Sequence, residues 1–167
     1  MVEDAFELGL YTGRRRDEIV NMKFSDIYEQ NGIPVYIKTE DYKYNLRNNL
    51  FKEDEKKYNY SPVINDLNLF LTKIGYPKYK GTDRYLLASD SSLTRATIKD
   101  KMSKAFSHYY TQLQFKHLRK TYITLLNHFT NGEAETITGH SGQEIIMKNY
   151  HDSKVFNNVL KDFRMTS

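Results

Sequence analysis

The sequence predicts a mainly α-helical domain with one small β-sheet or hairpin. Apolar residues recur at three- and four-residue spacing through most of the chain, which is typical of amphipathic helices. Two short stretches, residues 34–37 and 58–64, have the composition of strands instead, and Pro62 marks an edge position. A chain of 167 residues is long enough for one domain with a hydrophobic core.

The expected helices are defined by their ends as well as by their periodicity. Gly13 ends a first short helix, because glycine readily adopts the positive φ of a helix C-terminus. A second helix over residues 15–22 places Ile19, Val20 and Met22 toward a core. The remaining helices are expected over residues 65–74, 93–109, 118–129, 133–138, a segment around Tyr150 that opens with a capping box at 141–144, and 155–163.

The segments between these helices are of two kinds. Asn31-Gly32 predicts a turn, and residues 86–88 are short and apolar enough for a small buried segment. Residues 39–57 are long, polar and heavily charged. We expect this stretch to form a mobile hairpin tip or loop between the two strands.

The composition excludes several classes of protein. No run of eighteen apolar residues occurs, so no membrane span is expected, and the first residues lack the pattern of a signal peptide. The absence of cysteine excludes a disulfide scaffold and thiolate catalysis, and it fits a reducing, cytoplasmic compartment. A net charge of +4 permits nucleic-acid binding, but many unrelated domains are equally basic.

Four separated stretches combine residues that suit phosphate chemistry. Taken singly, each has an ordinary explanation, since arginines are usually solvated, a histidine in a turn is common, and the chain has 14 tyrosines. Their order along the chain gives them weight. The stretches are residues 12–18 with three consecutive arginines, Leu118-Arg119 at the start of a long helix, Gly139-His140 in a turn, and Tyr150.

In this order the stretches resemble the motifs of the tyrosine recombinase, or phage integrase, family. The family's Thr-Gly-x-Arg-x-x-Glu motif matches residues 12–18, which places its first catalytic arginine at Arg15 and its supporting acidic residue at Glu18. The His-x-Leu-Arg motif matches the stretch from Lys116 to Arg119, so Arg119 is the second catalytic arginine. The resemblance spans almost the whole chain and implies the fold of this family's catalytic domain.

Two positions depart from the family pattern. Lys116 stands where the motif has its first histidine, and His117 lies one residue late. Since the similar type IB topoisomerases often have a lysine there, we expect Lys116 to contact phosphate. Tyr150 follows His140 by ten residues, one more than the family's spacing, and an extra residue within 141–144 absorbs the difference.

The resemblance implies a reaction that these residue types can perform. The two arginines clamp the non-bridging oxygens of a DNA phosphodiester, and His140 donates a further hydrogen bond. Tyr150 attacks the phosphorus and forms a 3′-phosphotyrosyl ester, which conserves the bond energy for rejoining, so that neither a metal nor a cofactor is needed. Tyr122 and Tyr109 are weaker candidates for the nucleophile, because Tyr122 lies on a core stripe and Tyr109 has no basic neighbourhood.

The leaving 5′-oxygen needs a proton, which the family takes from a lysine on a β-hairpin. Lys38 is the expected residue, because it directly follows the strand at 34–37 and lies at a suitable distance from Arg15. Lys43 and Lys57 compete for this role in the same lysine-rich segment.

The expected partner is double-stranded DNA, with self-association into a tetrameric synapse through residues 152–164. The alternative for this terminal helix is that it completes the core of its own domain. By comparison with the family, the chain is expected to be a fragment that lacks the amino-terminal DNA-clamping domain and the first part of the catalytic domain. The leading hypothesis is a site-specific recombinase or integrase of a mobile element. A catalytically impaired DNA-binding remnant, a type IB topoisomerase-like relaxing enzyme and an RNA-binding or interaction domain remain as alternatives.

Overall fold

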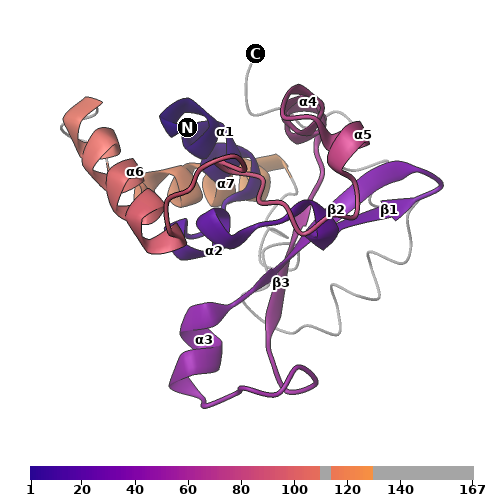
Figure 1. Cartoon of the computed structure of the whole chain (residues 1–167), viewed down its shortest axis with the longest axis horizontal. Coiled ribbons are helices and arrows are strands. Elements are labelled where there is room, and N and C mark those ends of the chain that lie inside the picture. Colours follow the sequence, from indigo (N-terminus) through magenta and orange to yellow (C-terminus); the bar gives the residue numbers. More distant parts are fainter. Residues whose placement is uncertain (110–113, 130–167) are drawn as a thin grey trace.

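The computed structural model describes residues 1–109 and 114–129, and this part of the chain is mainly α-helical with one small antiparallel sheet (Figure 1). The coarse fold class expected from the sequence is therefore confirmed. In chain order the elements are α1 (Val2–Thr12), α2 (Arg16–Asn21), a 3-10 turn (Phe24–Asp26), β1 (Ile27–Gln30), β2 (Ile33–Glu40), α3 (Tyr42–Arg47), β3 (Tyr58–Pro62), α4 (Asn65–Lys73), α5 (Tyr76–Tyr79), α6 (Arg95–Tyr109) and α7 (Lys116–Phe129).

Several expected elements lie outside the described residues. These are the short helix over 133–138, the helix around Tyr150 and the terminal helix over 155–163, together with His140 and the proposed association segment 152–164. Within the described ranges, no helix is both long and apolar enough to cross a lipid bilayer.

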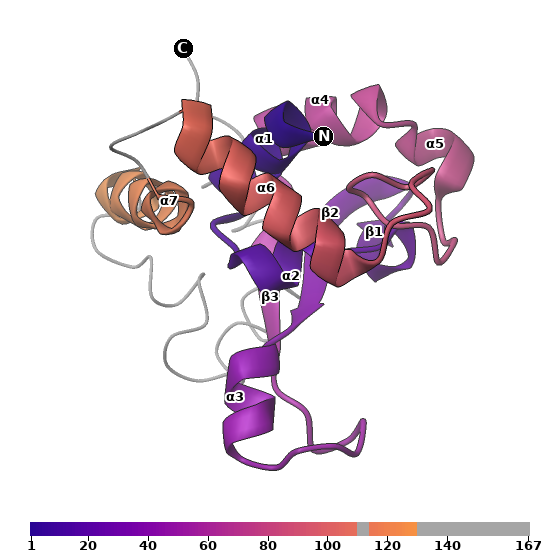
Figure 2. The same cartoon turned by 60° about the vertical axis from the view of Figure 1, so that its left-hand side comes forward.

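Helix α1 lies at the centre of the helical part of the domain. It packs against α7, α4, α2 and α6, and Figures 1 and 2 show these helices gathered on one side of the sheet. Its contribution to the core is Ala5 and Leu8, both fully buried. The core residues contributed by the other elements include Ile19, Met22, Ile37, Leu67, Leu71, Ile98, Met102, Tyr122 and Leu126.

The sheet has the order β1-β2-β3, with both pairs antiparallel. Asn31 and Gly32 both have positive φ, at 53° and 78°, as a tight two-residue hairpin turn requires, so the expected turn is confirmed. Strand β1 was not anticipated, because half of its residues are polar and only one face of it is covered. Along β2 the side chains alternate between the two faces, with Ile37 and Thr39 buried and Lys38 exposed.

The segment between β2 and β3 forms the tip of a hairpin, as expected, but it contains the helix α3 and is not only a mobile tip or loop. Asp41 caps the helix by accepting a hydrogen bond from the amide of Tyr44 at 3.1 Å. Asn45, which is buried, bonds twice to the backbone of Lys57, at 3.1 Å and 2.7 Å. Polar side chains therefore hold this segment in place. The spacing of apolar residues in the sequence gives no sign of such contacts.

The other predicted helices are confirmed with small changes at their ends. Helix α4 ends at Lys73 and α6 begins at Arg95, and the residues expected to face the core from α2 are buried. Helix α7 buries Leu118, Tyr122 and Leu126, so Tyr122 lies on a core stripe as expected. Leu125 is 38% exposed and lies outside this stripe.

Candidate phosphate-binding site

The turn between α1 and α2 builds the first part of the site. Gly13 ends α1 in the left-handed conformation, with φ 62°, and its amide donates to the carbonyl of Gly9 at 3.0 Å. A Cβ atom at Gly13 would lie 2.2 Å from the ring of Tyr122, so the turn fits closely under α7. The chain then continues directly into Arg14 and Arg15 at the start of α2.

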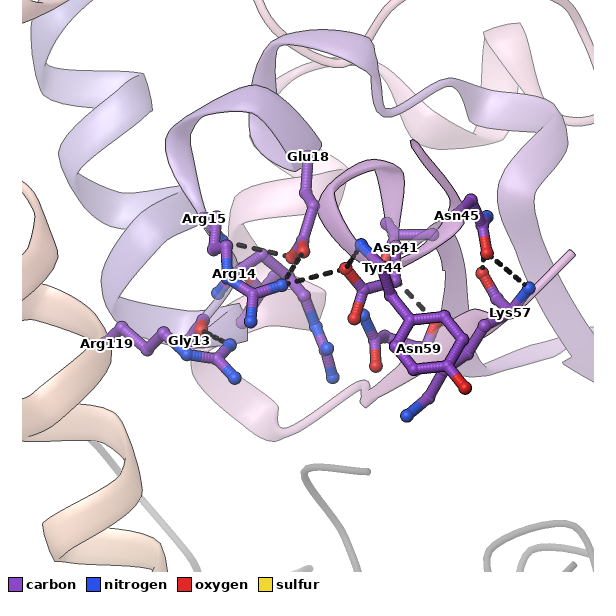
Figure 3. A network of polar contacts seen from close by, with 12 residues as sticks. Gly13, Arg14, Arg15, Glu18, Asp41, Tyr44, Asn45, Lys57, Asn59 and Arg119 are labelled. Atoms are coloured by element: carbon purple, nitrogen blue, oxygen red, sulfur yellow. Dashed lines mark hydrogen bonds and ion pairs between the residues drawn. The ribbon is translucent and has the colours of Figure 1, made fainter. Parts of the chain in front are cut away.

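Two carboxylates hold Arg15. Its Nη1 donates to Glu18 at 2.9 Å and to Asp41 at 3.0 Å, and its backbone amide donates to the other Glu18 oxygen at 3.1 Å (Figure 3). Burial lowers the pKa of Arg15, but the charges of Glu18 and Asp41 outweigh burial, and the net pKa is raised. The Arg15 side chain remains 38% exposed, so the guanidinium is both fixed and accessible.

Arg119 reaches the same turn from α7. Its Nη1 donates to the carbonyl oxygen of Gly13 at 2.6 Å, across 106 positions of sequence (Figure 3). Burial, reinforced by the nearby charge of Arg14, lowers the pKa of Arg119 to about 10. Arg119 therefore stays protonated at neutral pH, and a bound anion would restore part of the solvation that this guanidinium has lost.

Arg14 is the most deeply buried of the three consecutive arginines, at 2% exposure. Its Nε donates to the hydroxyl of Ser61 at 2.6 Å and its Nη2 donates to the carbonyl of Tyr60 at 2.6 Å. Its Nη1 is buried without a hydrogen-bond partner in the part of the chain that the structure describes. Within the described ranges, Arg14 therefore ties the turn to β3 through neutral groups and pairs with no carboxylate.

These side chains meet in one cavity of about 530 Å³, hereafter the cation pocket, between α2, α6 and the start of α7. The cavity brings together Arg15, Lys116 and Arg119, three of the residues predicted to hold the phosphate. Its single carboxylate among the described lining residues, Asp17, is paired with Lys99 at 2.8 Å. The cationic lining residues are Arg14, Arg15, Arg16, Lys116 and Arg119.

The first turn of α7 forms one wall of the cation pocket. Lys116 is the first residue of α7 and is exposed, and Gln114 and Phe115 line the pocket just before it. His117 is not among the described residues that line this pocket, and its Nδ1 accepts a hydrogen bond from the amide of Gln114 at 3.1 Å. The positive end of the helix dipole thus adds to the lysine charge at this wall.

Lys38 lies apart from the cation pocket. It points to the outer face of the sheet, where its ammonium lies 3.8 Å from the centre of the Tyr58 ring, and it lines a separate cavity. Lys57 lies opposite Asp41, whose amide donates to the Lys57 carbonyl at 3.0 Å. Asp41 and Lys57 lie one residue beyond the paired ends of β2 and β3, and the Lys57 ammonium lies 4.5 Å from the centre of the Tyr44 ring (Figure 3).

The sequence reasoning missed three residues of this site. Arg14 and Arg16 were visible in the run of three arginines, but the motif assigns a role to Arg15 alone. Asp41 had no signal of its own, because its contact with Arg15 depends on how the end of β2 meets the start of α2. Arg16 reaches across to α6, where its Nη1 donates to the hydroxyl of Ser103.

His140 and Tyr150 lie outside the described residues. Within the described ranges, no cluster of three or more histidine or acidic side chains is arranged to hold a metal ion. Comparison of the chain with protein-family models, with curated proteins and with solved structures finds no match. Several guanidinium and ammonium groups on one cavity wall are a chemistry that can hold an oxyanion.

Proposed function

We propose that this chain is the catalytic domain of a DNA strand-breaking and rejoining enzyme of the tyrosine recombinase type. The supporting observation is the cation pocket, in which Arg15, Lys116 and Arg119 meet although about a hundred residues separate the first from the others. The same three residues belong to the motif set that resembles this family. Double-stranded DNA is the proposed substrate.

In the proposed reaction the cation pocket holds the scissile phosphate. Arg15 and Arg119 neutralise the charge that develops on the non-bridging oxygens, and the fixed position of Arg15 between two carboxylates reduces the reorganisation needed. The phenol of Tyr150 gives up its proton to solvent, its oxygen attacks the phosphorus to form a P–O bond, and the bond to the 5′-oxygen breaks. The departing 5′-oxygen takes a proton from a hairpin lysine, and the reverse sequence rejoins the strand.

The geometry favours Lys57 over Lys38 as the proton donor. The backbone of Lys57 pairs with that of Asp41, the partner of Arg15, whereas Lys38 points to the outer face of the sheet. Lys43, the third lysine expected as a candidate from the sequence, lines a cleft together with Arg15 and stays the competitor of Lys57.

Trapping of a covalent complex tests the proposal. A bound site is first selected from a random duplex library, and a nicked version of it then prevents religation after cleavage. We expect a covalent protein–DNA complex that is absent in Tyr150→Phe and in Arg119→Ala, with Tyr28→Phe on the outer sheet face as a control that keeps it. A complex that persists in Tyr150→Phe would refute the assignment of the nucleophile.

The other outcomes identify the alternatives. Selective DNA binding without any covalent complex would replace the proposal with a catalytically impaired DNA-binding domain. Relaxation of a supercoiled plasmid that lacks the selected site would instead indicate a topoisomerase-like enzyme. Assembly of four copies on paired sites, and its loss when residues 152–164 are removed, tests the proposed synapse.

A further inference from the structure

A second cleft, of about 300 Å³, lies beside the cation pocket between α2 and α3. Its wall on the α3 side consists of Tyr42, Lys43 and Leu46, and its wall on the α2 side begins at Arg15. Arg15 therefore lines both cavities, so the two form adjoining parts of one surface. Figure 1 shows α3 at the end of the β2–β3 hairpin, apart from the main group of helices.

The apolar side chains of this cleft are exposed on a helix that is firmly held. Leu46 is 71% exposed and Tyr42 is 41% exposed. Helix α3 itself is fixed by the cap at Asp41 and by the two bonds between Asn45 and the Lys57 backbone. A held helix that presents a leucine and a tyrosine to solvent beside a charged site is a feature of binding surfaces.

The charges in the cleft favour an uncharged occupant. Besides Arg15, its described lining has one cation, Lys43, and two carboxylates, Asp17 and Glu18. A second phosphate would lie against these carboxylates, whereas the cation pocket next to it has a strong positive excess. The volume is at the lower end of the range for small-molecule sites, which begins at about 300 Å³, and suits one sugar and base rather than a duplex.

We infer that the cleft between α2 and α3 is a nucleoside subsite, which holds the sugar and base of an unpaired nucleotide whose phosphate Arg15 binds. Tyr42 and Leu46 contact the base by stacking and apolar packing, which every base offers, so the subsite selects for the presence of a base and not for its identity. This inference rests on the phosphate-binding role of the cation pocket in the proposed function.

Binding of small nucleotides to the full chain tests the subsite. The probes are thymidine 3′,5′-bisphosphate, the corresponding bisphosphate of abasic deoxyribose, and inorganic phosphate, each titrated with detection by NMR shifts. We expect the wild-type chain to bind the thymidine compound about tenfold more tightly than the abasic one, in the lower part of the range for one base stacked on an aromatic side chain. The Tyr42→Ala/Leu46→Ala variant should lose this preference and bind the abasic compound as before.

Two control variants separate stacking from other effects. Tyr42→Phe keeps the ring and should therefore keep the preference for the compound with a base. Leu69→Ala removes a leucine that is similarly exposed, at 65%, on α4, and should also keep this preference. An equal affinity of the wild-type chain for both bisphosphates overturns the inference, and so does a preference that survives in the double variant. If the chain prefers the compound with a base but forms no covalent complex at Tyr150, the subsite stands and the catalytic proposal is rejected. If the covalent complex forms but no such preference is found, the catalytic proposal stands and the subsite is rejected.

Discussion

Arg119 donates a hydrogen bond to the carbonyl oxygen of Gly13, and the ring of Tyr122, three residues further along α7, covers the same glycine. One turn of α7 therefore closes over the junction between α1 and α2. The position of Arg119 relative to Arg15 depends on this fit, because Arg15 lies only two residues beyond Gly13. The fit is thus a structural requirement of the cation pocket as well as of the core.

Gly13→Ala should strongly destabilise the protein. Gly13 has φ 62°, which costs an alanine about 1–2 kcal/mol, and the added methyl group would lie 2.2 Å from the buried Tyr122 ring. Overpacking of a core adds about 1–3 kcal/mol, so we expect the free energy of unfolding to fall by about 3 kcal/mol in urea denaturation.

Gly32→Ala is the matched control for the backbone effect. Gly32 has φ 78°, and a Cβ atom there meets nothing within 4 Å. Its substitution should lower the free energy of unfolding only through the unfavourable backbone conformation, by about 1 kcal/mol. Equal losses of stability in the two variants would show that the contact between Gly13 and Tyr122 is unimportant.

Asp41→Asn should lower stability at neutral pH, with the difference disappearing in acid. Burial raises the pKa of Asp41, but the Tyr44 amide, the Arg15 charge and Asn59 outweigh burial and leave the pKa below its ordinary value. The ionised carboxylate therefore stabilises the fold above the pKa of the unfolded chain, near 3.9, and this contribution is lost as the pH falls through the lower folded value.

We expect the free energy of unfolding of Asp41→Asn to lie about 1 kcal/mol below that of the wild type at pH 7, since Arg15 is partly exposed and solvent screens the pair. Asparagine retains the capping hydrogen bond, so the comparison isolates the charge. Urea denaturation at a series of pH values from 7 down to about 2 measures the difference. A gap that stays constant across this range would contradict the charge-based explanation.

The fold and the site were predictable to different degrees, for physical reasons. Helices such as α4 and α7 follow from apolar periodicity, because their own side chains form the core. Helix α3 was missed because buried polar contacts of Asp41 and Asn45 hold it. In the site, the cations were visible as sequence motifs, whereas the pairing of Asp41 with Arg15 exists only in the folded chain.

Lys116→Ala should reduce the salt dependence of binding to a DNA duplex. Lys116 is exposed at the wall of the cation pocket, and each neutralised phosphate contributes about −0.9 to the slope of log K against log salt. We expect the slope to become shallower by about 1 in fluorescence anisotropy titrations over a range of salt concentrations.

Lys73→Ala is the charge-matched control for this measurement. Lys73 is half-exposed on α4 and pairs with Glu7 on α1 at 3.2 Å, away from the cation pocket. Its removal should leave the slope unchanged. If both variants reduce the slope equally, DNA binding does not centre on the cation pocket.

Lys57→Ala should slow strand cleavage in a way that depends on the leaving group. If Lys57 protonates the 5′-oxygen, its loss should slow cleavage of ordinary DNA by about a hundredfold or more. A substrate with sulfur in place of the bridging 5′-oxygen has a leaving group that needs no proton, so Lys57→Ala should cleave it at close to the wild-type rate. Lys38→Ala, which removes a lysine from the outer face of the sheet, should cleave both substrates normally. If the sulfur-containing substrate restored the cleavage rate of Lys38→Ala but not that of Lys57→Ala, Lys38 would be the proton donor instead.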